Sequence, residues 1–458
     1  MIRTGDRTVD KQIDELHAMG QGHVFRFWDK LDAAARQSLI AEVMEIDCAL
    51  MARLIAGLVP GATAPPPAPV IEPCPIIDRE NDPQRAEAER AGIAAIRASK
   101  VAAFLVAGGQ GTRLGYDGPK GAFVIGPLNG RTLFQIHAEK IRAAGRRYGV
   151  IIPWYIMTSN LNHHATLAFF KDHGHFGIDP ANISFFEQSM IPAVDTHGRL
   201  ILAARGALFR NPNGHGGSLA ALHTSGALAD MRRRGIEYIS YFQVDNCLVR
   251  IVDPVFIGFH ILEQAEMSSK VVDKRDPEEK VGVIGKVNGR MGVIEYSDLP
   301  REQKNARNDD GSLKYAAGSI AIHILSRTFV EEENKGGLRL PYHKAVKKIP
   351  FIDASGALAK PEKENGVKFE TFVFDALADT KRSVTLRTRR EDDFAPVKNA
   401  AGLDSPATAR TAMDAQAKRW LAAAGWTGPL PGTVELSPLW ADSAEEVRAR
   451  LDGMRYQG

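Results

Sequence analysis

The sequence predicts an α/β protein built on a doubly wound, mainly parallel sheet. Between residues 101 and 246, short apolar runs alternate with stretches whose apolar residues recur at helical spacing. The run "VAAFLVA" at 101–107 is continuously apolar, as strands covered on both faces are. The run at 237–246 is also apolar and ends in a carboxylate, Asp245. This alternation is typical of a sheet with helices on both faces, whose ligands bind at the carboxyl ends of the strands.

The composition is that of an ordinary globular protein. Of 458 residues, 44% are hydrophobic and 25% are charged, enough for a large core in about two or three domains. A net charge of +3 gives no reason to expect nucleic acid or a membrane surface as a partner. No stretch has the ~18 apolar residues of a membrane span, and the polar N-terminus lacks a signal-peptide core. Three widely spaced cysteines, Cys48, Cys74 and Cys247, favour a reduced, cytoplasmic protein. The oligomeric state is not indicated.

Helices are expected in the first 58 residues. Apolar residues recur there at helical spacing, namely Val43, Ile46, Leu50 and Leu54. The proline-rich stretch 59–70 stops both helix and sheet, and we interpret it as a connector. With a further helix expected at 84–100, the pattern predicts an N-terminal, mainly helical domain over residues 1–100.

The alternating segment divides into strands and helices. Strands are expected at 101–107, 150–158, 181–188 and 237–246, and helices at 132–149, 161–174 and 218–235. Farther on, two β-rich runs within 281–296 flank Asn288-Gly289, a strong hairpin signal. A strand at 318–325, a helix around 368–377 and a strand at 382–389 complete a catalytic domain predicted over 101–390. Two helical patches in an Ala-, Gly- and Pro-rich sequence predict a small C-terminal domain over 391–458.

The loop after the first apolar run is a candidate phosphate site. Gly108, Gly109 and Gly111 let backbone N–H groups approach a ligand closely, and Arg113 and Lys120 add positive charge. The loop matches neither the P-loop nor G-x-G-x-x-G, which it misses by one residue. The alternative is a structural turn. However, the next helix begins only near residue 132, and an excursion of that length favours a phosphate-gripping loop.

The segment "LVAGGQGTRLGYDGPKGAF" resembles the signature of the eukaryotic-type UDP-sugar pyrophosphorylases, and the chain is most similar to the UDP-N-acetylhexosamine pyrophosphorylases. Further segments match in family order from about 85 to 415, among them "TLFQIHAEKI", "FFEQSMIPA", "NPNGHGG", "NGVKFETFVFDAL" and "REDDFAPVKNA". The resemblance implies a mixed, mainly parallel nucleotidyltransferase sheet that is Rossmann-like, or GT-A-like.

The implied reaction joins UTP and a sugar 1-phosphate to give a UDP-sugar and pyrophosphate. The sugar phosphate oxygen attacks the α-phosphorus of UTP in line, so catalysis is positioning and charge neutralisation without an enzyme nucleophile. The resemblance implies that Gly108 and Gly109 hold the nucleotide and that Arg113 and Lys120 grip the triphosphate. Gln188 matches the family's uracil-reading glutamine.

Asp245 matches the family's metal-binding aspartate. A carboxylate at the end of a buried strand is well placed for Mg²⁺ (or Mn²⁺), which prefers oxygen ligands and bridges phosphates. The alternative from the residues alone is a helix N-cap. Lys368 and Lys398 match family lysines near the sugar phosphate and the phosphoryl groups.

The implied sugar and uridine contacts include two departures from the acetylhexosamine pattern. The family usually has Asn at the two positions where this chain has His215 and Ser319. The enzyme could therefore instead use glucose 1-phosphate, or accept several sugar 1-phosphates. N-acetylhexosamine 1-phosphate, with N-acetylglucosamine 1-phosphate first, is the expected substrate. The residues concerned are Gly214, His215, Gly282, Glu295, Ser319, Phe372 and Phe374.

Two other functions remain open from the residues. An NAD(P)-dependent oxidoreductase would explain the α/β pattern and the glycine loop, although the glycine spacing argues against it. An inactive UDP-sugar sensor would explain Ser319. A histidine group has no common zinc-site spacing and is interpreted as helix-surface and loop residues: His163, His164, His173 and His175.

Overall fold

The computed structural model describes residues 2–59 and 69–455, so most of the predicted proline-rich connector lies outside the described residues. The chain divides into two compact units. The smaller comprises Met1–Ala68, Ser189–Gly217 and Leu340–Val373, and the larger comprises Pro69–Gln188, Ser218–Arg339 and Phe374–Gly458. This division differs from the consecutive domains predicted at 1–100, 101–390 and 391–458, because two segments from the middle of the chain share one core with the N-terminal helices.

The larger unit is built on an 11-stranded sheet whose main path runs β2-β20-β12-β15-β11-β3-β4-β5, with β1, β13 and β14 beside it. The strands are β1 (Ile71–Pro73), β2 (Ile77–Asp78), β3 (Val101–Val106), β4 (Trp154–Thr158), β5 (Ile183–Glu187), β11 (Tyr238–Gln243), β12 (Met267–Asp273), β13 (Val283–Val287), β14 (Arg290–Ile294), β15 (Ala317–Ser326) and β20 (Ser383–Arg387).

The sheet is mixed and mainly parallel, which confirms the predicted fold class. β11, β3, β4 and β5 are successive parallel neighbours, and β20 is parallel to both β2 and β12. β15 is antiparallel to all three strands that pair with it, β11, β12 and β13. The alanines, Phe104 and Leu105 of β3 are fully buried, as a strand covered on both faces requires.

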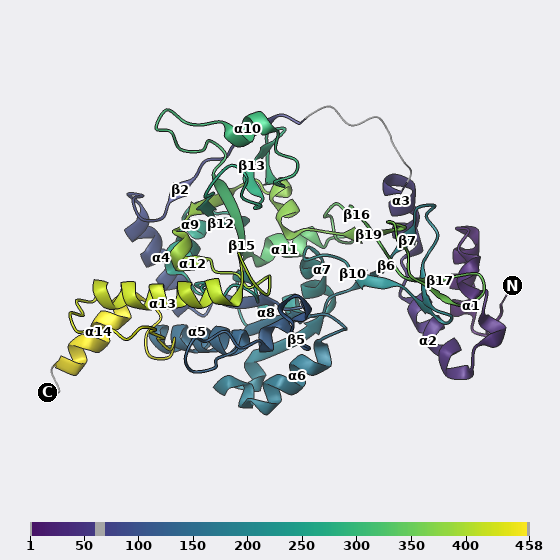
Figure 1. Cartoon of the computed structure of the whole chain (residues 1–458), viewed down its shortest axis with the longest axis horizontal. Helices are drawn as coiled ribbons and strands as arrows, with labels where there is room; N and C mark the ends of the chain where they lie inside the picture. Colours follow the sequence, from purple (N-terminus) through teal and green to yellow (C-terminus); the bar gives the residue numbers. More distant parts are fainter. Residues whose placement is uncertain (1, 60–68, 456–458) are drawn as a thin grey trace. The chain divides into compact units, whose positions relative to one another are not determined.

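Helices cover this sheet, among them α9, which contacts β12, β15 and β20 (Figure 1). The helices of the larger unit are α4 (Arg85–Arg97), α5 (Leu133–Tyr148), α6 (His163–Asp172), α7 (Gly217–Thr224), α8 (Ala227–Arg233), α9 (Pro254–Leu262), α10 (Arg301–Asn305), α11 (Arg327–Glu333), α12 (Arg390–Asp393), α13 (Pro406–Ala423) and α14 (Ala444–Arg455). The bounds of α5 follow from its ends: the Thr132 side chain accepts from Gln135 N–H, and Gly149 ends the helix at φ 71°.

Helices α4 and α9 lie side by side because each has a glycine at the contact. A Cβ on Gly92 would lie 1.9 Å from the Pro254 carbonyl oxygen, and one on Gly258 would lie 1.6 Å from that of Ala88. Only glycine permits this backbone approach. Farther along the chain, α13 and α14 also lie side by side (Figure 1) and enclose a small apolar core that includes Leu421 and Val447.

The smaller unit combines three helices with short strands. The helices are α1 (Arg7–Ala18), α2 (Ala33–Met44) and α3 (Cys48–Leu58). The strands are β6 (Met190–Pro192), β7 (Val194–Asp195), β8 (Leu202–Ala204), β9 (Ala207–Leu208), β10 (Arg210–Pro212), β16 (His343–Lys347), β17 (Phe351–Ile352), β18 (Leu358–Ala359) and β19 (Gly366–Glu370). Leu16, Val43, Val194 and Phe369 belong to one buried cluster, which joins all three chain segments.

The helix predicted around 368–377 is wrong. Residues 366–370 form β19, which pairs with β16 and β7, and a 3₁₀ helix follows at Val373–Asp379. Val367 and Phe369 are buried whereas Lys368 and Glu370 are partly exposed, a strand alternation that outweighs the helical pattern. The helix predicted at 218–235 is two helices, α7 and α8, separated at Gly226 with φ 79°.

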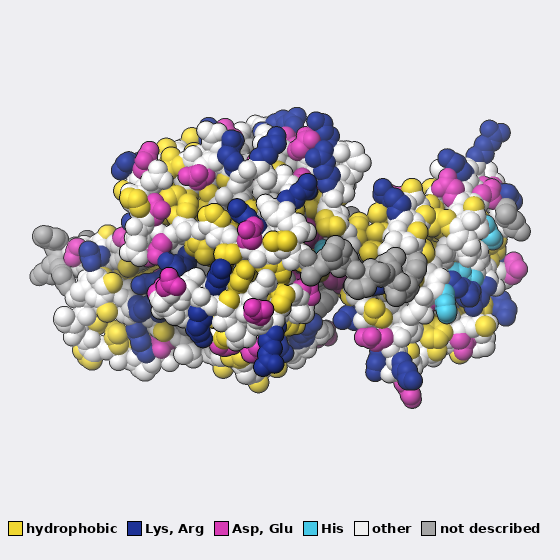
Figure 2. Space-filling model, turned by 90° about the horizontal axis from the view of Figure 1, so that it is seen from above, with side chains coloured by type: hydrophobic (Ala, Val, Ile, Leu, Met, Phe, Trp, Pro, Cys, Tyr) yellow, Lys and Arg dark blue, Asp and Glu magenta, His cyan; other side chains and the backbone are white. Residues whose placement is uncertain are grey.

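The predicted hairpin is confirmed. β13 and β14 pair from Val283↔Ile294 to Val287↔Arg290, and the turn residues Asn288 and Gly289 have φ of 51° and 79°. Two positive φ values define the turn that Asn-Gly favours. Figure 2 shows basic and acidic side chains interspersed over the visible surfaces, as the small net charge leads one to expect. Among the described residues, no helix has both the length and the apolar character needed to cross a bilayer.

Candidate active site

The carboxyl ends of β11, β3, β4 and β5 meet at one edge of the sheet, because these strands are parallel neighbours. Gly108 follows β3, Gln188 follows β5 and Asp245 follows β11. β15 is antiparallel to β11 and therefore begins at the same edge, where Ser319 lies. The sheet thus brings the predicted nucleotide and metal residues to the edge at which ligands bind in such folds.

The glycine loop turns its carbonyl groups to one side. Asn162 Nδ2 donates to the carbonyl oxygens of Ala107 (2.9 Å) and Gly109 (3.1 Å), and Ser159 Oγ donates to that of Gly108 (2.8 Å). In a trans peptide the N–H of the next residue points the opposite way. The N–H groups of Gly108, Gly109 and Gln110 therefore face away from Asn162, and no acceptor is assigned to them within the described part of the chain. Such a set of amides is a ready anion cradle.

Lys120 lies against this loop. Its backbone N–H donates to Gly109 O (3.1 Å), and its Nζ lies 3.8 Å from Asp245 Oδ2. Only 16% of the Lys120 side chain and 11% of the Asp245 side chain are exposed, so the charges interact with little solvent screening. The next residue, Gly121, packs closely on α5, because a Cβ there would lie 2.2 Å from the Phe134 ring. Arg113 lies earlier in the loop, in the 3₁₀ turn Thr112–Leu114. It is exposed and has no ion pair to any described residue.

Gln188 is 8% exposed and faces the loop. Its backbone N–H donates to Thr158 O (2.8 Å), extending the β4–β5 pairing by one residue. Its Oε1 lies 3.4 Å from the position that a Cβ on Gly108 would take. The amide of Gln188 therefore lies next to the loop backbone at Gly108, and an amide can pair with one donor and one acceptor of a base edge.

Asp245 is connected to Lys398 through the backbone. Val397 N–H donates to Asp245 O (2.9 Å), and the neighbouring Asn246 side chain accepts from Ala395 N–H (3.0 Å). These bonds hold the segment that carries Lys398 beside the end of β11. Lys398 itself is half-buried.

Three predicted sugar residues form a group at the hairpin. Ser319 N–H donates to Gly282 O (2.8 Å), and a Cβ on Gly282 would lie 3.6 Å from Glu295 Oε1 and 2.6 Å from Val293 Cγ1. Close by, Ala321 has φ 54°, where β15 bulges against β12. A bulge bends a strand and redirects its side chains, which is frequent beside active sites.

The remaining sugar and uridine residues fall into different units. Phe374, in the larger unit, lies in the 3₁₀ helix Val373–Asp379 and is half-buried. Gly214, His215, Phe372 and Lys368 lie in the smaller unit.

Within the smaller unit, the loop at Gly214 is built around the end of β19. Gly214 has φ 83°, and a Cβ on it would lie 2.2 Å from Thr371 O, so glycine is required. His215 Nδ1 accepts from Val373 N–H (3.2 Å), which leaves the proton of the neutral ring on Nε2 as a donor. The His215 ring lies 5.3 Å from the ring of Phe372. Lys368 Nζ lies 5.2 Å from the Phe209 ring.

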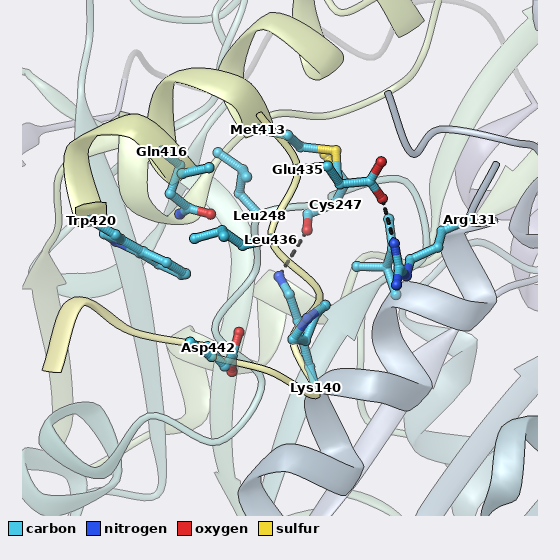
Figure 3. Close-up of a pocket in the computed structure, with 14 residues that line it drawn as sticks. Arg131, Lys140, Cys247, Leu248, Met413, Gln416, Trp420, Glu435, Leu436 and Asp442 are labelled. Carbon is cyan, nitrogen blue, oxygen red and sulfur yellow. Dashed lines mark hydrogen bonds and ion pairs between the residues drawn. The ribbon is translucent and has the colours of Figure 1, made fainter. Parts of the chain in front are cut away.

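A small cavity of about 40 Å³ lies behind the segment that follows Asp245 (Figure 3). Lys140 reaches into it from α5 and donates to the carbonyl oxygens of Cys247 (2.8 Å) and Val249 (2.9 Å). Burial lowers the pKa of the Lys140 ammonium and raises that of the Asp442 carboxyl across the cavity. Lys140 thus anchors the backbone just beyond Asp245.

Sequence reasoning missed Ser159 and Asn162, which hold the glycine loop. A signal was present, since "TSNLN" follows a buried strand and carries hydroxyl and amide side chains at its carboxyl end. Applying the strand-end argument to β4 as well as to β3 and β11 would have included them.

The chain is similar to known proteins both in sequence and in fold. A family described as UTP–glucose-1-phosphate uridylyltransferase matches residues 71–416. The chain is 40% identical to UDP-N-acetylhexosamine pyrophosphorylase-like protein 1 of Homo sapiens, over 96% of this chain and 94% of that protein. It is 36% identical to UDP-N-acetylglucosamine pyrophosphorylase of Saccharomyces cerevisiae, over 89% and 90%. The crystal structure of the Trypanosoma brucei uridine diphosphate N-acetylglucosamine pyrophosphorylase with an inhibitor is similar at a TM-score of 0.84 and 29% identity, over 99% of this chain and 97% of that one.

Proposed function

This chain belongs to the UTP–glucose-1-phosphate uridylyltransferase family, and from that premise we propose that it makes a UDP-N-acetylhexosamine from UTP and an N-acetylhexosamine 1-phosphate. The chain is a nucleotidyltransferase, which sets the oxidoreductase alternative aside. N-acetylglucosamine 1-phosphate is the first substrate to test, because relatives aligned over most of the chain are named for it.

The observation that carries the proposal is the set of groups at the carboxyl edge of the sheet. The outward N–H groups of Gly108, Gly109 and Gln110 can bind phosphate oxygens. Lys120 supplies a largely buried positive charge next to Gly109. Gln188 supplies an amide next to Gly108 that can pair with the uracil edge. Together these groups offer the contacts that a uridine triphosphate needs.

In the proposed reaction, an oxygen of the sugar 1-phosphate forms a bond to the α-phosphorus of UTP. The bond from that phosphorus to the oxygen bridging the β-phosphate breaks, and pyrophosphate leaves with its electron pair. Negative charge therefore builds on the leaving group. We assign its neutralisation to Lys120 and Arg113, and that of the incoming phosphate to Lys368 and Lys398. No residue has to form a covalent bond.

Asp245 fits a magnesium ion. Its carboxylate is at a strand end, and its 3.8 Å separation from Lys120 Nζ exceeds hydrogen-bonding distance, so an oxygen can serve as a ligand. Among the described residues no cluster of three or more His, Cys, Asp or Glu forms a full metal cage. Mg²⁺ in nucleotide enzymes needs only one or two carboxylates, because phosphates and water supply the rest. Such an ion would screen phosphate charge.

We assign part of the sugar contact to the residues at the hairpin. Glu295 can accept hydrogen bonds from sugar hydroxyls, and Ser319 is only half-buried at the same place. We assign Gly214, His215, Phe372 and Phe374 the uridine and sugar contacts implied by the family resemblance. We also propose a reducing, cytoplasmic location, since Cys48, Cys74 and Cys247 are all free thiols.

The test is pyrophosphorolysis of a panel of UDP-sugars, followed by the forward reaction with UTP and Mg²⁺. We expect UDP-N-acetylglucosamine to react fastest, and Lys120→Ala to lower kcat by about 10²- to 10³-fold, as loss of a transition-state charge contact does. A large preference for UDP-glucose would overturn the sugar assignment. UTP binding without turnover on any sugar phosphate would support a sensor instead.

A further inference from the structure

The loop that carries Gly108 and Gly109 has little regular structure to hold it. β3 ends at Val106, and Ala107 N–H makes the next sheet-like bond, to Met157 O (2.8 Å). Beyond it, glycine backbone is intrinsically free to rotate. A loop of this kind binds phosphate only if its amides are oriented beforehand, since ordering them on binding would cost conformational entropy.

Asn162 supplies that orientation from β4–α6. It is 1% exposed, and every polar atom of its amide is used. Nδ2 donates to the carbonyl oxygens of Ala107 and Gly109, and Oδ1 accepts from the backbone N–H of Ser159 (2.9 Å). The Ser159 hydroxyl donates its one proton to Gly108 O (2.8 Å), and its Oγ also lies 3.2 Å from Asn162 Oδ1. Three consecutive carbonyl oxygens are therefore bound to one two-residue clamp.

We propose that Asn162, with Ser159, is a positioning residue that holds the glycine loop in its phosphate-binding orientation. This inference rests on the proposed function. Asn162 does not touch the substrate: it fixes the carbonyl groups of residues 107–109, and trans-peptide geometry then directs the N–H groups of residues 108–110 to the opposite side. Losing the clamp weakens UTP binding more than sugar phosphate binding.

The experiment compares the full-length Asn162→Ala and Ser159→Ala variants with wild type. We expect Asn162→Ala to raise the KM for UTP by about 10- to 100-fold, the usual effect of removing a group that orients a ligand-binding residue. Ser159→Ala removes one contact to the loop and should raise the KM for UTP less than Asn162→Ala does. The KM for the sugar 1-phosphate should change by less than about threefold. The gain in Tm on adding UTP should be largest in wild type, smaller in Ser159→Ala and smallest in Asn162→Ala. This readout does not depend on turnover.

Asn334→Ala is the matched control. The Asn334 side chain is also buried and also donates from Nδ2 to two backbone carbonyl oxygens, those of Leu219 (3.0 Å) and Val330 (2.8 Å). It should lower the Tm without changing the KM for UTP. A buried amide with only a structural role would behave as Asn334 does.

Unchanged UTP KM and unchanged UTP-dependent Tm gain in Asn162→Ala, alongside a Tm loss like that of Asn334→Ala, would overturn the proposal. If Asn162→Ala does not fold, Ser159→Ala decides the question by the same two readouts. A wild-type protein that transfers no uridylyl group refutes the proposed function instead, while UTP-dependent stabilisation still tests the clamp.

Discussion

Lys120 and Asp245 show how a single ion pair can serve a charged substrate. Their charged atoms are 3.8 Å apart, and both side chains are largely shielded from solvent. A buried pair stabilises each charge only modestly once desolvation is counted. The pair therefore places a cation and a carboxylate side by side at the ends of the strands, next to the glycine loop.

We expect residue 319, a serine in this chain, to influence which sugar the enzyme prefers. Its backbone is fixed to Gly282, so a longer side chain would project from the same point beside Glu295. We predict that Ser319→Asn raises the ratio of kcat/KM for UDP-N-acetylglucosamine over UDP-glucose by about 10-fold, the effect of one added hydrogen bond of roughly 1.4 kcal/mol. Pyrophosphorolysis of both nucleotides measures the ratio. An unchanged ratio would show that residue 319 does not discriminate between the sugars.

At the scale of elements, a buried charge network joins β12 to the N-terminus of α9 and to α12. Lys270 is fully buried in β12, and its Nζ lies 2.7 Å from Asp253 and 2.9 Å from Asp393. Asp253 caps α9 and also pairs with Arg79 at 3.2 Å. These partners hold the pKa of Asp253 well below its ordinary value despite burial. The network fixes the segment that leads on to Lys398.

We predict that Lys270→Met destabilises the protein by about 3–5 kcal/mol, because it leaves two buried carboxylates without their shared cation. Urea unfolding, followed by fluorescence, measures the loss. Lys335→Met is the control: Lys335 pairs with Glu332 at 3.2 Å but 74% of its side chain is exposed, so its removal should cost less than about 1 kcal/mol. Equal effects of the two variants would contradict the role of burial.

At the scale of the whole molecule, two buried histidines make stability depend on pH. Burial lowers the pKa of His137 and of His260 to about 3. His137 lies against Val244 O, and His260 lies between the hydroxyls of Ser268 and Ser326. Each ring is neutral in the fold but takes up a proton in the unfolded chain below the ordinary pKa of about 6.5.

Between that value and about 3, the unfolded state binds more protons, so stability falls as pH falls. We predict a loss of about 2 kcal/mol per histidine between about pH 7.5 and pH 5. Urea midpoints across this range measure it. His260→Gln should reduce the slope, whereas replacing the exposed His173 should leave it unchanged. An unchanged slope in His260→Gln would show that this ring is not buried neutral.

Local sequence patterns were sufficient to predict many of the strands and helices, and the residues of recognisable motifs. β3, α5 and the β13–β14 hairpin were predicted because a continuous apolar run, the helical spacing of apolar residues and Asn-Gly act within a few residues. The family resemblance to UDP-sugar pyrophosphorylases is confirmed by the match over residues 71–416. Where the pattern was ambiguous, as at 366–370, strand pairing with β16 and β7 decided.

The sequence by itself determined the α/β class, the glycine loop and the strand-end aspartate, because each depends on interactions between neighbours along the chain. The tertiary structure alone decided that Asn162 holds the loop, that Lys270 finds Asp393, and that segments around 200 and 360 share a core with the first helices. Those outcomes depend on contacts between residues up to hundreds of positions apart. The physical reason is burial, because a polar group that is removed from water needs a hydrogen-bonding or charged partner, and the fold can supply that partner from a distant part of the chain.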